Sequence, residues 1–184
     1  MSFFESNPRL FMTVCILSVL VLGVLFFRLK GKTKIRRSAR WRRKLASEML
    51  HDLRVQRPPP PQFFTRLRAV DALAFEELVL DAFHGMGAKV KRSSRYSGDG
   101  GSDGEIRLNG KWYLCQMKRY KGAIKPVHIA DFNKLCRQRK LSGFFIHTGR
   151  TGPVSKEMFD KFDLLTCISG RDLYHFLVDG EIEH

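Results

Sequence analysis

An uncharged run at residues 10–27 limits what this chain can fold into more than any other feature. The run, LFMTVCILSVLVLGVLFF, would rise about 27 Å as a helix, just enough to cross the hydrocarbon core of a bilayer. Positive charge follows the run, whereas a cleaved signal peptide carries its positive charge first. We therefore predict a transmembrane helix after a short tail of residues 1–9, with a cleaved signal peptide as the alternative.

The basic charge of the chain is concentrated directly after this run. The formal net charge is +15, and residues 28–44 hold ten Lys or Arg and no acid. Residues 64–184 are closer to balance, with twenty Lys or Arg against fifteen acids. The positive-inside rule then predicts a single-pass protein of the inner (cytoplasmic) membrane with its C-terminal part in the cytoplasm. We expect residues 28–44 to attract anionic lipid headgroups, with DNA as the alternative partner of these charges.

Residues 28–62 are predicted to connect this anchor to a globular domain. Apolar residues recur at helical spacing over residues 38–56, with Ser38 as a plausible N-cap, which predicts a juxtamembrane helix. The prolines at 58–61 predict an extended polyproline spacer that ends this helix. The globular domain is then expected over residues 63–184, a length typical of one domain.

Predicted helices and strands alternate from Phe63 onward. Hydrophobic periodicity and turn residues predict helices at 70–85, 127–139, from about 153 and at 171–178, and strands at 88–92, 105–108, 112–119, 143–148 and 164–168. The pair Asn109-Gly110 is a strong signal for a hairpin between the second and third strands. This order predicts an α/β sandwich in which a central mixed β-sheet is flanked by helices.

The predicted hairpin also gathers polar side chains. Gln116 and Lys118 alternate with Cys115 and Met117, so they project from one face of the strand. Asp103 enters the preceding strand after a glycine-rich turn, and the hairpin can bring it opposite Gln116 and Lys118. A hard divalent cation prefers such oxygens: the Asp103 carboxylate, the Gln116 amide and, as a further candidate, the Met117 carbonyl.

The runs SGDGGSDGEI and WYLCQMKRY resemble the core of the Mrr-like (type IV) restriction endonuclease family. This family is a branch of the PD-(D/E)xK nuclease superfamily in which glutamine replaces the second metal-binding carboxylate. The resemblance covers roughly residues 70–178. It implies a restriction-endonuclease-like fold and a DNA endonuclease that depends on Mg²⁺, with Mn²⁺ as a substitute, and that would suit the restriction of foreign DNA.

The resemblance also implies roles for individual residues. Asp103 and Gln116 would hold the metal, while Lys118 would position the attacking water or stabilise charge on the phosphate. Glu76 could reach the metal through water, and Asp99 is a weaker candidate for the same shell. Flanking phosphates would be held by three basic residues, Arg119, Lys121 and Lys125. One departure is His147, which stands where the family more often has Thr or a small residue.

Simpler interpretations remain open for each of these residues. Asp103 alone could cap its own turn, Gln116 and Lys118 could be solvated residues of an edge strand, and Glu76 could be a solvated helix position. At the level of function, the alternative is a catalytically inactive, membrane-tethered DNA-binding or sensor protein of the same fold. The sequence leaves open whether the protein forms a homodimer and whether RNA is also cut.

Overall fold

The structure, a computed structural model, describes residues 8–93 and 101–182 and divides into two units, Met1–Trp41 and Arg42–His184. Helix α1, Pro8–Gln56, begins in the first unit and ends in the second. Within the first unit, Ile16, Leu20 and Val24 are more than half exposed, because a single helix cannot bury its own apolar side chains.

The N-terminal helix differs from the one that the sequence predicts. Residues 10–27 and 38–56 lie in one uninterrupted helix, α1, rather than in two. In the part of the chain that the structure describes, no helix combines the length and the apolar character needed to cross a membrane. The transmembrane helix predicted at residues 10–27 is therefore not confirmed.

The proline segment after α1 is only partly extended. Helix α2 spans Pro60–Ala69, with Pro59 as its extended N-cap residue and Pro60 at its start. Proline is tolerated in the first turn of a helix because its missing N–H would have no partner within the helix. The polyproline spacer predicted over residues 58–61 is thus wrong in its second half.

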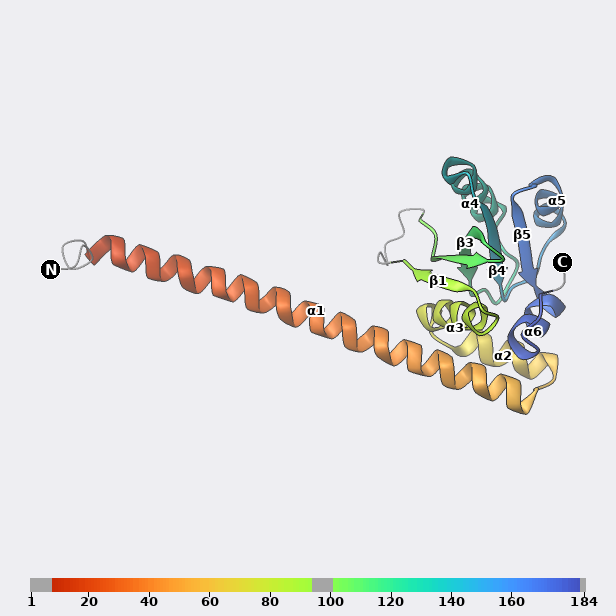
Figure 1. The fold of residues 1–184 in the computed structure, drawn as a ribbon, viewed down its shortest axis with the longest axis horizontal. Coiled ribbons are helices and arrows are strands. Elements are labelled where there is room, and N and C mark those ends of the chain that lie inside the picture. Colours follow the sequence, from red (N-terminus) through yellow and green to blue (C-terminus); the bar gives the residue numbers. More distant parts are fainter. Residues whose placement is uncertain (1–7, 94–100, 183–184) are drawn as a thin grey trace. The chain divides into compact units, whose positions relative to one another are not determined.

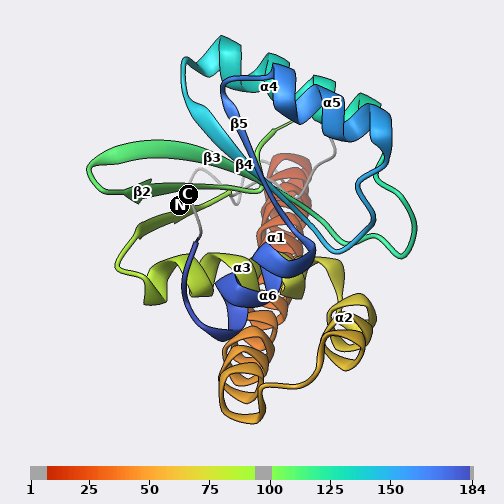
Figure 2. The same ribbon diagram turned by 90° about the vertical axis from the view of Figure 1, so that its right-hand side faces the viewer.

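The second unit contains a five-stranded sheet with helices on both faces (Figures 1 and 2). Its strands are β1 (Lys89–Arg92), β2 (Gly104–Leu108), β3 (Lys111–Lys118), β4 (Ser142–His147) and β5 (Leu165–Ser169). The remaining helices are α3 (Ala72–Gly85), α4 (Pro126–Arg139), α5 (Pro153–Lys161) and α6 (Gly170–Val178). These elements confirm the segments predicted between residues 70 and 178, with ends that shift by one or two residues.

The sheet is mixed, as predicted, and its strands follow the order β1-β2-β3-β4-β5. β1, β2 and β3 pair antiparallel, whereas β3, β4 and β5 pair parallel. The turn between β2 and β3 has positive φ at both Asn109 (50°) and Gly110 (81°), which is the tight hairpin turn that this pair favours. Parallel pairing requires crossover connections, which α4 and α5 supply.

The core has one layer on each face of the sheet. On one face, α3 and α6 pack together with α2 and the end of α1, and the buried residues include Leu53, Phe63, Phe75, Phe83 and Phe176. On the other face, α4 and α5 cover Leu114, Ile129, Phe132 and Phe145. Figure 2 shows these two helical layers on opposite sides of the strands.

The end of α1 belongs to this core. Ala46, Leu50 and Leu53 are buried, and their spacing of three or four residues places them on one side of the helix. The sequence predicts these residues in a juxtamembrane helix that precedes a globular domain at residues 63–184. The compact unit instead begins at Arg42.

Gly143 sets how closely α4 approaches the sheet. A Cβ atom at this position would lie 2.7 Å from both the Cys136 sulfur and the Phe132 ring. Such a distance is far inside van der Waals contact, so glycine allows α4 to pack directly on β4.

Candidate active site

Asp103 is fixed at the start of β2 by contacts with β3. Its backbone N–H donates to the Cys115 carbonyl (2.9 Å), which extends the β2–β3 ladder by one residue. Its carboxylate oxygen Oδ2 accepts from the Met117 N–H (2.7 Å) and from the Gln116 side-chain amide (2.5 Å). The group of Met117 that faces Asp103 is thus its N–H, rather than the carbonyl considered as a metal ligand. The carboxylate is held in one place across the hairpin.

Gln116 and Lys118 lie on the same face of β3, as the strand alternation predicts. Gln116 is almost fully buried at 9% exposure, and Lys118 is half-buried as the last residue of the strand. Cys115 and Met117 belong to the core on the opposite face. A buried Gln116 bonded to Asp103 excludes the simple edge-strand interpretation for this residue, because β3 is an interior strand paired on both sides.

Glu76 joins this group from helix α3. The helix begins after Asp71, whose carboxylate accepts from the N–H groups of Leu73 (3.1 Å) and Ala74 (3.2 Å) as an N-cap. Glu76 lies in the second turn and is half-buried. Its pKa is raised to about 8, first by burial, then by the negative charge of Asp103, against the opposing effect of Lys118. Glu76 therefore lies within electrostatic range of both hairpin residues.

The pKa of Asp103 is also raised, and burial is the largest cause. The Met117 N–H, the Lys118 ammonium and the Gln116 amide all oppose this shift. Ionising the partly buried carboxylates of Asp103 and Glu76 together is costly, and a bound cation would offset that cost.

The residues of this site suit a hard divalent cation. Asp103 and Glu76 supply carboxylate oxygens, which such ions prefer. The Gln116 amide now donates to Asp103 and would turn by about 180° to present its oxygen, a change that leaves the shape of the side chain almost the same. Within the described ranges, no group of three or more His, Cys, Asp or Glu residues could hold a metal, so any site here relies on Gln116 and water as well.

The three predicted phosphate-binding residues have different surroundings. Lys121 and Lys125 are exposed, and Lys125 is the N-cap residue of α4. Arg119 is half-buried, and its Nη1 donates to the Arg68 carbonyl (2.5 Å). The guanidinium of Arg119 therefore ties β3 to the end of α2. Asp99 lies outside the described residues.

An aromatic pair that the sequence does not predict as part of the site lies just after β3. The rings of Tyr120 and His128 stack with their centroids 6.1 Å apart. Burial lowers the pKa of His128, and the positive charges of Lys118 and Lys125 lower it further. His128 therefore lies within electrostatic range of Lys118, although the histidines of the sequence, scattered without ligand spacing, gave no signal of this.

His147 ends β4 beside Lys118 in the strand register. It is fully buried, and its Nε2 contacts the Thr151 hydroxyl (3.2 Å) and the Cys167 sulfur (3.5 Å). Its Nδ1 has no hydrogen-bond partner among the described residues. Burial lowers the pKa of His147 to about 4, with the Gly149 backbone opposing the shift. His147 is a neutral side chain of the interior.

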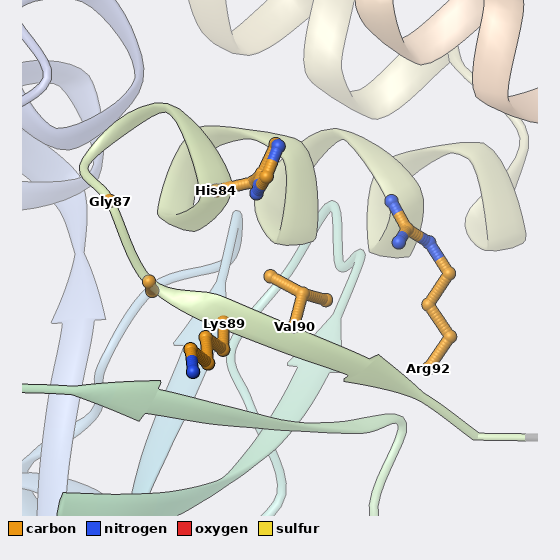
Figure 3. A pocket seen from close by; sticks show the side chains of 6 residues that line it. His84, Gly87, Lys89, Val90 and Arg92 are labelled. Atoms are coloured by element: carbon orange, nitrogen blue, oxygen red, sulfur yellow. The ribbon is translucent and has the colours of Figure 1, made fainter. Parts of the chain in front are cut away.

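A surface pocket between α3 and β1 is separate from this site. Its lining includes His84, Lys89, Val90 and Arg92 (Figure 3) and none of the predicted catalytic residues. The Arg92 guanidinium is already engaged by two acids, Glu77 (2.5 Å) and Asp81 (2.7 Å).

The family model of the Mrr catalytic domain, described as a restriction endonuclease, matches residues 67–177, more than half of the chain. The chain belongs to the Mrr-type restriction endonuclease family. Searches among curated proteins and among solved structures gave no match.

The Mrr-type domain begins inside α2 and ends inside α6, so it contains Glu76, Asp103, Gln116 and Lys118. The mixed sheet with flanking helices is consistent with a restriction-endonuclease-like fold. The Mrr-type assignment identifies a nuclease of the restriction-endonuclease type, whose reaction is the hydrolysis of DNA phosphodiester bonds.

Proposed function

We propose that this protein is a metal-dependent DNA endonuclease that uses Asp103, Gln116, Lys118 and Glu76. One observation carries the proposal: the Asp103 carboxylate is held by Gln116 and by the Met117 N–H, beside the charges of Lys118 and Glu76. An isolated turn aspartate would cap its own backbone and would have no reason to meet a glutamine, a lysine and a second carboxylate.

Each residue has a distinct task in this proposal. Bound Mg²⁺ would polarise the scissile phosphate and lower the pKa of a water molecule. Asp103, fixed by its two hydrogen bonds, would supply the main anionic ligand, and Gln116 and Glu76 would be the further oxygen donors. Lys118 places a positive charge beside them, where it can orient the attacking water and stabilise the negative charge that develops on the phosphate.

The proposal is tested by plasmid cleavage with the full-length protein, since Ala46, Leu50 and Leu53 of α1 are part of the core. We expect cleavage with Mg²⁺ or Mn²⁺ and none in EDTA. Asp103→Asn keeps an oxygen acceptor for the Met117 N–H but removes the charge, and it should lower the rate at least 100-fold.

Lys118→Met should have a similar effect, and the matched controls Asp160→Asn and Lys156→Met, both exposed on α5, should cut like the wild type. Equal rates for the wild type and Asp103→Asn with both metals would reject the proposal. That result would favour an inactive DNA-binding or sensor protein of the same fold.

We also propose that residues 10–27 anchor the protein in the inner (cytoplasmic) membrane, with the nuclease domain in the cytoplasm. The support is the uncharged run and the basic residues at 28–44 that follow it, which could also bind anionic lipids. Recovery of the full-length protein in the soluble fraction would reject the anchor.

Cutting both strands of a duplex would suit a homodimer. A rate of plasmid linearisation that rises with the square of protein concentration would support this arrangement, whereas a linear dependence would count against it.

A further inference from the structure

Three exposed side chains form a row across the sheet near the tip of the hairpin. Lys89 of β1 is paired with Arg107 of β2, which is paired with Trp112 of β3. Directly paired residues project from the same face of a sheet. Figure 3 shows Lys89 pointing away from α3, on the opposite side of β1 from Val90. The row therefore faces away from the α3 layer.

This row shares its face with the proposed catalytic residues. Along β3, side chains alternate, so Trp112, Gln116 and Lys118 all project on one side. Leu114 lies between Trp112 and Gln116 on this face and is fully buried under α4 and α5, so the end of α4 separates the row from the active site.

The charges between the row and the active site are already compensated. Glu105 lies between them on β2 and accepts from Lys91 (3.0 Å) and from Arg139 of α4 (2.9 Å). Arg107 donates to the Gly110 carbonyl (3.2 Å) and, like Lys89, has no ion-pair partner within the described part of the chain. The row thus presents two uncompensated positive charges beside an indole that is 39% exposed.

We propose that Lys89, Arg107 and Trp112 form a further DNA contact at the tip of the hairpin, beyond the active site. The two cations contact phosphates, which positions the DNA without reading its sequence. The indole stacks on a base, a contact that every base can make. The inference rests on the proposed function, because it takes DNA as the substrate of the Asp103 site.

The test measures DNA binding in EDTA, where no cleavage occurs, with the full-length protein. The sequence has two tryptophans, so Trp41→Phe leaves Trp112 as the only indole reporter. Its fluorescence should be quenched when a labelled single-stranded or duplex oligonucleotide binds. The double variant Lys89→Ala/Arg107→Ala should bind more weakly and lower the slope of log Kd against log salt by about 1.4 for a single strand or 1.8 for a duplex.

The matched control is Lys111→Ala/Lys156→Ala, which removes the same charge. Lys111 is exposed on the same hairpin but projects from the other face, and Lys156 is exposed on α5. Unchanged fluorescence together with salt slopes equal in the two double variants would overturn the inference. Loss of binding to anionic phospholipid vesicles, but not to DNA, in Lys89→Ala/Arg107→Ala would overturn it too.

The two proposals fail separately. If the protein cleaves DNA while the row has no effect on binding, only the proposed DNA contact of the row is wrong. If the row binds DNA but the wild type and Asp103→Asn show equal cleavage, the endonuclease proposal is wrong and the binding surface stands.

Discussion

His147 should make the stability of the nuclease domain fall in mild acid. The side chain is fully buried, and burial lowers its pKa from the ordinary 6.5 to about 4. Between these two values, the unfolded chain binds a proton that the folded domain excludes. The stability that comes from excluding this proton is therefore complete above pH 6.5 and is lost as the pH falls toward 4.

The size of the effect follows from the shift. Each unit of pKa difference corresponds to about 1.4 kcal/mol, so the full loss is about 3 kcal/mol, of which about 2 kcal/mol is already lost at pH 5. Since domains of this size are stable by only about 5–15 kcal/mol, the change is large enough to measure directly.

The assay is urea unfolding of the full-length protein at pH 7.5, 6, 5 and 4.5, followed by Trp112 fluorescence in a Trp41→Phe background. His147→Gln cannot take up the proton, so its free energy of unfolding should fall less with pH than that of the parent. Carboxylates titrate in both proteins and cancel in the difference. If the two pH profiles run parallel within about 0.5 kcal/mol, the argument from burial is wrong.

Three further predictions concern packing and charge in the same domain. Leu53→Ala should cost about 2–5 kcal/mol of unfolding free energy because Leu53 is fully buried, whereas Val55→Ala, 67% exposed on the same helix, should cost less than about 0.5 kcal/mol. Gly143→Ala should cost about 1–3 kcal/mol by forcing α4 away from β4, and Gly122→Ala, where a Cβ meets nothing within 4 Å, is its control. Arg92→Ala should cost about 1–3 kcal/mol because it removes the closest partner of the buried Glu77, and Arg43→Ala, whose exposed side chain lies 3.5 Å from the same acid, should cost less than about 1 kcal/mol. Urea unfolding measures all three pairs, and equal losses within any pair would contradict the packing or pairing assigned to it.

The fold of the second unit could be predicted from the sequence because local signals agree with the tertiary structure. The Asn109-Gly110 turn has the positive φ angles that its residues favour, and the strands around it have the expected register. Asp103, Gln116 and Lys118 come together because strand alternation and one hairpin determine their positions. Strand alternation and hairpin turns depend on residues that are close in the sequence, so they can be predicted from it directly.

Longer-range packing could not be predicted in this way. The periodicity of residues 38–56 indicated a helix, but nothing in it showed that Leu50 and Leu53 are buried against the rest of the unit. The sequence alone does not separate a catalytic Glu76 from a solvated one, because a carboxylate on a helix is usually solvated and only the fold brings it within electrostatic range of Asp103. Nothing in the sequence groups Lys89, Arg107 and Trp112, since their alignment depends on the pairing of three strands.

The number of residues in the hairpin decides whether Asp103 and Gln116 project from the same face of the sheet. Asp103 faces Gln116 only because the chain between them folds back in one register, and a strand has just two sides. Inserting a single residue between Asp103 and the turn would send the carboxylate to the opposite face, even though the hairpin could still form. Inserting two residues, one on each arm, would keep Asp103 opposite Gln116. Natural variation in the length of this hairpin is therefore expected to proceed in even steps, because an odd step between Ile106 and the turn would also turn the fully buried Ile106 away from the core and reduce stability as well as cleavage.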